Sequence, residues 1–132
     1  ITATDRFKAA SSGAGVASQL LQWALEDTPG HVINYMTGLP WEKPEKYLHG
    51  SPIANLGGCT TPTLIHCGEE DPRVPIEHSR ALFRGLHDYL EVPTLLLTYP
   101  GQGHGLGTCT MRRAKMEWDL VWFERHLRRE AE

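Results

Sequence analysis

The sequence lacks the features that mark several specialised classes of protein. Its 132 residues include only three cysteines and no CxxC pair, so neither a disulfide framework nor a common type of zinc site is expected. Thirteen basic residues against 16 acidic ones give a formal net charge of −3, which provides no basic surface for nucleic acid or an anionic membrane. No apolar run approaches the roughly 20 residues that cross a bilayer, and no secretory signal peptide is visible. We therefore expect a cytoplasmic protein without nucleic-acid or membrane partners.

What remains is the profile of one globular domain. Hydrophobic residues make up 40% of the chain and charged residues 22%, and 132 residues are enough to enclose a core. No internal repeat, low-complexity segment or linker divides the sequence, so we expect residues 1–132 to form a single domain. The chain begins with Ile1 in place of Met, and its first residues, ITATDRF, show neither a helix cap nor a strand pattern. This beginning favours a fragment that continues a helix or loop lying upstream.

Three segments have the composition of strands. Residues 7–16 form a run of small side chains with glycines near its end, which suits a short buried strand followed by a turn. Residues 63–67 and 92–99 are almost continuously apolar and are closed by glycine or by Pro-Gly. For residues 63–67, continuous apolarity in place of alternation predicts a central strand of a parallel sheet, and residues 92–99 are predicted to form a second buried strand.

Helical periodicity separates these strands. Residues 18–25 and 76–90 repeat apolar side chains at three- and four-residue spacing, whereas residues 28–56 are rich in proline and glycine and predict short helical turns. A last helix is predicted over about residues 110–129. Its two apolar stripes consist of Met111, Ala114, Trp118 and Val121 and of Met116, Leu120, Phe123 and Leu127. So broad an apolar face should lie flat on a sheet, and the alternating order predicts an α/β fold with parallel strands and right-handed crossovers.

The loops after the two apolar strands carry the side chains with the clearest chemistry. Asp71 follows the strand that ends at Cys67, and His104 follows the strand that ends at Tyr99. Neighbouring parallel strands lie about 4.8 Å apart and end at the same edge of the sheet, so these loops can meet. A carboxylate beside one ring nitrogen fixes the histidine tautomer and lets the other nitrogen accept a proton from a nucleophile. Two simpler interpretations stay open: a turn-forming Asp71 in a charged loop, and a His104 on a flexible surface loop.

A metal centre is a weaker hypothesis. The candidate ligands are His66, Cys67, His104 and Cys109. His66 and Cys67 are adjacent in a predicted strand and would point to opposite faces, so they are poorly placed to share one ion. We therefore expect neither a metal nor another cofactor.

Two longer motifs carry a resemblance to a known family. The segments TPTLIHCGEEDPRVPIEHSRALFRGL and VPTLLLTYPGQGHG, in this order, resemble the C-terminal part of the prolyl oligopeptidase family of α/β-hydrolase serine peptidases. TDRFKAA and PWEKPEKYLHGSPI are also similar to that family, so the resemblance covers almost the whole chain. The likeness is greatest to its acylaminoacyl-peptidase and dipeptidyl-peptidase members. The resemblance implies the C-terminal portion of an α/β-hydrolase fold, with about three mainly parallel strands and flanking helices.

The resemblance also implies roles for three residues. In such enzymes the aspartate of the first loop is the acid of the catalytic triad and the histidine of the second is its base; these positions fall on Asp71 and His104. The arginine two residues after the acid often binds a substrate carbonyl, which points to Arg73. The alternative for Arg73 is a surface side chain that stabilises its own loop. The substrates would be peptides with acylated or dipeptidyl N-termini.

The nucleophile of such a triad has no candidate in this sequence. These hydrolases carry the serine in a GxSxG motif that precedes the acid and the histidine, and residues 1–132 contain no GxSxG. The serines lie in other contexts: Ser11, Ser12, Ser18, Ser51 and Ser79. Nothing in the sequence activates Cys109 as a substitute, and Cys67, where many relatives have histidine, is interpreted as a buried strand residue. Because loss of the nucleophile costs about a millionfold in subtilisin, we expect the chain to be inactive alone.

Three functions remain in competition. The leading hypothesis is the C-terminal fragment of a serine peptidase, which carries the Asp and His of the triad but lacks the nucleophile-elbow half of the domain. The alternatives are a non-catalytic α/β module that acts by protein association, and a fragment of a related esterase or lipase. Arg73 favours peptides, because a carbonyl-binding arginine suits an amide backbone. A first strand with an unpaired edge also predicts self-association, or pairing with the missing N-terminal half.

Overall fold

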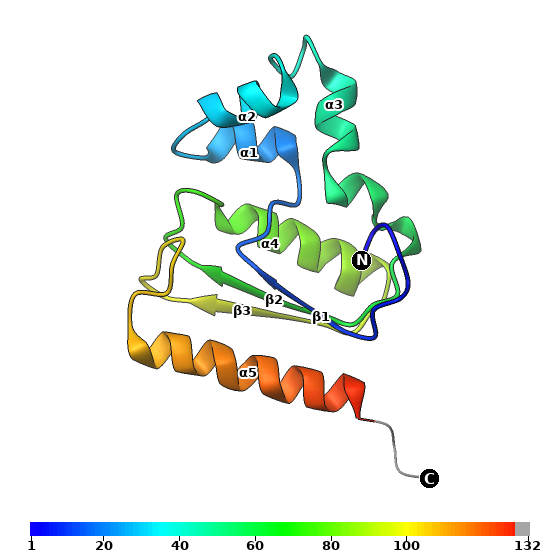
Figure 1. Cartoon of the computed structure of the whole chain (residues 1–132), viewed down its shortest axis with the longest axis vertical. Helices are drawn as coiled ribbons and strands as arrows, with labels where there is room; N and C mark the ends of the chain where they lie inside the picture. Colours follow the sequence, from blue (N-terminus) through cyan, green and yellow to red (C-terminus); the bar gives the residue numbers. More distant parts are fainter. Residues whose placement is uncertain (129–132) are drawn as a thin grey trace.

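The computed structural model describes residues 1–128, and a parallel three-stranded sheet lies at its centre (Figure 1). The strands are β1 (Ala10–Gly13), β2 (Thr63–Gly68) and β3 (Thr94–Tyr99), and they lie side by side in the order β1-β2-β3. Both pairings are parallel, so the carboxyl ends of the strands gather at one edge. The predicted α/β fold with about three parallel strands and flanking helices is confirmed.

β2 is the central strand, and all six of its residues are buried. Its continuous apolar sequence is what a strand covered on both faces requires. β1, in contrast, is only half-buried, because its far edge pairs with no strand among residues 1–128. The strand expected within residues 7–16 is therefore present, but it is shorter and less buried than predicted.

Helices cover both faces of the sheet (Figure 1). On one face, α4 (Ile76–Phe83) continues through a π-helical segment, η2 (Arg84–Tyr89), while α5 (Cys109–Leu127) lies along the other face. Four shorter elements form a further layer beyond α4: α1 (Gln19–Leu25), α2 (Gly30–Met36), α3 (Pro44–His49) and the 3₁₀ segment η1 (Pro52–Gly58). Within residues 1–128, no helix combines the length and apolarity that a bilayer crossing requires.

Side-chain caps set the start of two of these helices. At α1 the Ser18 hydroxyl accepts a hydrogen bond from the Leu21 N–H, and at α5 the Thr108 hydroxyl accepts one from the Met111 N–H, each at 3.3 Å. Such caps satisfy N–H groups that the first helical turn leaves without a partner. The start of α5 therefore agrees with the prediction to within one residue, whereas its predicted end, Arg129, lies outside the described residues.

The hydrophobic core lies between the sheet and α4. Its buried members are Ala17, Leu56, Cys59, Ile65, Leu82, Leu86 and Val92. Burial of each large aliphatic side chain contributes about 1.5–3 kcal/mol relative to exposure. This packing holds β2 and α4 together and so fixes the two ends of the loop between them.

α5 meets the sheet through a different face from the one predicted. Trp122 is buried against the sheet and Asp119 is half-buried, whereas Met116 and Leu120 are each 64% exposed. Trp118, Val121 and Leu127 are also exposed. The prediction that both apolar stripes lie flat on the sheet is therefore wrong. The physical reason is that Asp119 hydrogen-bonds to His66 of β2, which turns a partly polar face of the helix inward.

Candidate active site

The loop after β2 holds Asp71 in a fixed orientation. Its side chain is fully buried, and its Oδ1 accepts hydrogen bonds from the backbone N–H of Arg73 at 2.8 Å and of Val74 at 2.9 Å. A buried carboxylate needs such partners because an unpaired charge would cost several kcal/mol. Asp71 therefore does form its own turn, as the simpler interpretation expected, but it uses only one oxygen to do so.

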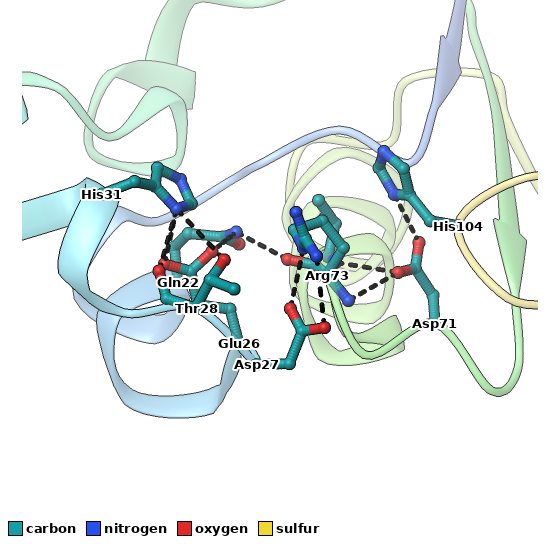
Figure 2. Close-up of polar contacts among 9 residues, drawn as sticks. Gln22, Glu26, Asp27, Thr28, His31, Asp71, Arg73 and His104 are labelled. Atoms are coloured by element: carbon teal, nitrogen blue, oxygen red, sulfur yellow. Dashed lines mark hydrogen bonds and ion pairs between the residues drawn. The ribbon is translucent and has the colours of Figure 1, made fainter.

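The second oxygen of Asp71 faces His104. Asp71 Oδ2 lies 3.0 Å from His104 Nδ1 (Figure 2). The carboxylate accepts a hydrogen bond from the Nδ1–H, which leaves Nε2 of the neutral ring as an acceptor. The histidine side chain is 54% exposed, and Figure 2 shows its second ring nitrogen on the side of the ring away from Asp71. The structure thus brings together the two residues that the sequence analysis paired.

Backbone contacts join the two loops and set this distance. The Glu69 N–H donates to the Tyr99 carbonyl at 3.1 Å, and the Glu70 N–H donates to the Gln102 carbonyl at 2.9 Å. Gly68 is essential to this approach, because a Cβ atom there would lie 2.3 Å from the carbonyl oxygens of Gln102 and Gly103. The relation between acid and histidine is therefore built by main-chain geometry as well as by their own hydrogen bond.

A cavity of about 730 Å³ opens beside His104, between the carboxyl edge of the sheet and the start of α5. It is lined by the ends of the strands, the loop of His104 and the first turns of α5, including Gly13, His66, Gly103, His104, Arg112 and Lys115. Within residues 1–128, the His104 ring hydrogen-bonds only to Asp71. The arrangement can hold a proton on Nε2 and stabilise the resulting imidazolium, but the described residues bring no hydroxyl or thiol into hydrogen-bond contact with that nitrogen.

A buried polar network lies beneath this cavity, and the sequence analysis missed it. Asp119 Oδ1 accepts hydrogen bonds from the Ser11 hydroxyl at 2.6 Å and from His66 Nε2 at 3.0 Å, while Lys115 pairs with its other oxygen. Because Nε2 carries the proton, His66 Nδ1 accepts a hydrogen bond from the Tyr99 hydroxyl at 2.8 Å. The only signal in the sequence was the four-residue spacing of Lys115 and Asp119.

Burial and hydrogen bonding compete in the electrostatics of the network. Burial lowers the pKa of His66, against the opposing effect of Asp119, so the ring is neutral. Burial also opposes ionisation of Asp119, but hydrogen bonds from Lys115, Ser11 and His66 lower its pKa below the usual range. The network is therefore a carboxylate held by neutral and cationic donors, and it ties β1, β2 and α5 together.

The residues considered as metal ligands do not form a site. Among residues 1–128, no three His, Cys, Asp or Glu side chains are grouped so that they would hold an ion. His66 points toward Asp119 of α5, whereas Cys67 neighbours Ser79 of α4, on the other face of the sheet. Burial raises the pKa of Cys67, which keeps the thiol protonated. Cys109 is exposed at the start of α5.

Arg73 projects from the acid loop toward the turn between α1 and α2. Its Nε donates to Asp27 Oδ1 at 2.7 Å and its Nη2 donates to Asp27 Oδ2 at 3.3 Å (Figure 2). The main chain is joined as well, because the Asp27 N–H donates to the Pro72 carbonyl at 2.9 Å and Gln22 Nε2 donates to the Arg73 carbonyl at 2.7 Å. Arg73 therefore links its loop to another segment, and its side chain is still 47% exposed.

The known proteins that are similar to this chain are peptidases or acylamino-acid-releasing enzymes. The profile of the prolyl oligopeptidase family matches residues 1–130. The uncharacterized peptidase YuxL of Bacillus subtilis is 29% identical over 128 residues, 94% of this chain and 19% of that protein. The acylamino-acid-releasing enzyme of Rattus norvegicus is 32% identical over 83 residues, 63% of this chain and 11% of the enzyme. The solved Pyrococcus horikoshii acylaminoacyl peptidase superposes with a TM-score of 0.89 at 25% identity, covering 99% of this chain and 22% of that one. The chain thus spans about a fifth or less of these relatives.

Proposed function

This chain belongs to the prolyl oligopeptidase family, and we propose that it forms the acid- and base-carrying part of a serine peptidase with an α/β-hydrolase fold. The observation that carries the proposal is the 3.0 Å contact between Asp71 Oδ2 and His104 Nδ1. A carboxylate with one oxygen held by two backbone N–H groups and the other on a half-exposed imidazole is the acid–base half of a catalytic triad.

In the proposed reaction, His104 Nε2 takes the proton of a serine hydroxyl while the serine oxygen bonds to the carbonyl carbon of the substrate. Asp71 stabilises the imidazolium and keeps its ring in place. The same proton then passes to the leaving amine as the peptide bond breaks, and water hydrolyses the acyl-enzyme in a second round. The serine would come from a GxSxG motif in another part of the polypeptide, because residues 1–132 contain none.

The free edge of β1 supports a position for that motif. β1 ends at Gly13, which lines the cavity beside His104, and its outer edge pairs with no strand among residues 1–128. A further parallel strand at this edge would end beside the same cavity and could deliver its serine toward Nε2. We also propose that the exposed apolar side chains of α5 pack against the remainder of such a domain, and that the isolated chain self-associates through them.

The proposed substrates are peptides with acylated or dipeptidyl N-termini, and Arg73 would hold a substrate carbonyl. Two of the five guanidinium N–H groups bind Asp27, so three remain for an acceptor on the substrate. The name of the rat relative supports an acylated amino acid at this position. Three unpaired cysteines favour a reducing compartment, which is consistent with a cytoplasmic enzyme.

Covalent labelling tests the proposal. The full polypeptide that carries this chain should react with a fluorophosphonate probe at a single serine, and His104→Ala should abolish the labelling because the hydroxyl is no longer activated. The isolated 132-residue chain should not label. Labelling of the isolated chain, or an unlabelled full polypeptide, would contradict the proposed division of the triad.

A further inference from the structure

The partner of Arg73 suggests a determinant of specificity that motif comparison does not reveal. Asp27 lies in the turn between α1 and α2, 46 residues before Arg73 in the chain, and meets the guanidinium through both carboxylate oxygens. The two side chains are 40% and 47% exposed, so the pair sits at the surface next to the acid loop. Figure 2 shows the pair on the Asp71 side of the Gln22–Glu26 contact.

The Asp27 carboxylate is held in this position by more than the ion pair. Its own N–H donates to the Pro72 carbonyl at 2.9 Å, so the main chain keeps Asp27 next to the loop of Arg73 even if the side-chain contact is weakened. The hydrogen bond from Arg73 lowers the pKa of Asp27, and the carboxylate is therefore ionised at neutral pH. The charge of Arg73 is thus compensated before any substrate arrives.

A compensated arginine selects differently from a free one. A free guanidinium pairs strongly and in bidentate fashion with a carboxylate. With Asp27 on Nε and Nη2, the remaining N–H groups still serve a neutral carbonyl oxygen, but a second carboxylate would lie close to Asp27 and be repelled.

We propose that Asp27 is a specificity-determining residue. It leaves Arg73 able to bind the carbonyl of a neutral acyl group but disfavours an acyl group that carries a carboxylate. This inference rests on the proposed role of Arg73 in substrate binding. Asp27 itself acts through Arg73 and takes no part in the chemical steps.

Kinetics of the full polypeptide on two matched substrates test the inference. An acetyl- and a succinyl-peptide p-nitroanilide with the same following residues differ chiefly by one carboxylate. Asp27→Asn keeps the size of the side chain and its backbone bond to Pro72 but removes the charge. We expect the ratio of kcat/KM, succinyl over acetyl, to rise about 3- to 10-fold at low ionic strength through a lower KM for the succinyl substrate, and to fall back with added salt. Asp27→Glu should restore the original ratio.

Three outcomes separate this role from a structural one. If Asp27→Asn lowers kcat/KM equally for both substrates and leaves their ratio unchanged, Asp27 only supports its loop and the inference is overturned. In Arg73→Met the effect of Asp27→Asn on the ratio should shrink, because the acyl group is no longer held beside Asp27, and an undiminished effect would also overturn the inference. A third measurement needs no variant: a strong preference of the unmodified protein for the succinyl substrate, decaying with salt, would contradict compensation of Arg73. If the unmodified protein cleaves neither substrate and does not label with fluorophosphonate, the proposed function itself fails.

Discussion

At the carboxyl edge of the sheet, Asp71 is buried and both of its oxygens have partners, whereas the Met116 and Leu120 side chains of α5 are each 64% exposed. The first region is completed by contacts between neighbouring loops of this chain. The second presents apolar surface of the kind that folded domains normally cover.

The acid–base pair of the proposed enzyme is self-contained, whereas the surface of α5 is not. The acid–histidine contact depends on β2, β3 and two short loops, all of which lie within 42 residues from Thr63 to His104. The exposed apolar side chains of α5 and the edge of β1 that pairs with no strand among residues 1–128 are the surfaces that we propose other segments of a domain to cover. We therefore expect changes at the carboxyl edge to affect catalysis, and changes at α5 to affect association and stability.

The largest expected effect is the loss of the acid–base pair itself. In the full polypeptide, His104→Ala should lower kcat by about 10⁴- to 10⁶-fold and Asp71→Asn by about 10⁴-fold, because the nucleophile then lacks its base or the base is held in the wrong tautomer. Steady-state hydrolysis of an acyl-peptide substrate measures both. His87→Ala, which removes an exposed histidine of η2, serves as the control. Retention of activity by His104→Ala would remove this residue from the mechanism.

Close approach of the two loops predicts the next effect. In Gly68→Ala the added Cβ would meet the carbonyl oxygens of Gln102 and Gly103 at 2.3 Å, so the loops must separate. We expect a loss of about 1–3 kcal/mol in the free energy of unfolding and about 100-fold in kcat, since small displacements of a base are costly. Gly57→Ala is the matched control, because its Cβ would meet nothing within 4 Å. Equal activity of the two variants would argue against a backbone-built site.

The carboxyl edge was predictable from sequence, whereas the contacts of α5 and Arg73 were not. Continuous apolar runs in the sequence indicate β2 and β3. Because the strands are parallel, the loops of Asp71 and His104 must lie at the same edge of the sheet. For α5, periodicity identified apolar positions around much of the helix but gave no means to decide which face meets the sheet. That choice depends on His66 and Asp119, which are 53 residues apart. The Asp27–Arg73 pair is likewise a long-range contact that no local pattern encodes.

Self-association tests the role proposed for the exposed apolar side chains of α5. In the isolated chain, Leu120→Gln should shift the molar mass measured by light scattering toward that of the monomer, because it removes exposed apolar surface from α5. Leu48→Gln is the matched control, since Leu48 of α3 is exposed to almost the same extent, 62% against 64%. A clean monomer of the unmodified chain at high concentration would contradict the proposed association.

The smallest effect concerns the network between α5 and the sheet. His66 is neutral when folded because burial lowers its pKa, and the unfolded chain takes up a proton at this residue near pH 6.5. The unfolded state thus binds more protons, and the free energy of unfolding should fall as the pH drops from about 7.5 to 5.5. The groups that face His66 are Asp119, Tyr99 and Lys115.

Chemical denaturation across this range measures the fall, and His66→Gln should reduce it. The reduction will be partial, because burial also lowers the pKa of His78 and of His126, with the same sign. His49→Gln, at an exposed position of α3, is the control. A pH dependence that is identical in His66→Gln and in the unmodified protein would show that His66 does not contribute.

The proposed function requires that a serine from elsewhere in the polypeptide reaches the Asp71–His104 pair. Its most direct test is the distance between His104 Nε2 and the serine Oγ of a GxSxG motif in an experimental structure of the full polypeptide. We predict a separation of about 2.6–3.2 Å, with the serine on a strand that pairs with the free edge of β1. The proposed function would be contradicted by a structure in which the loop of His104 keeps this arrangement but its Nε2 faces no serine.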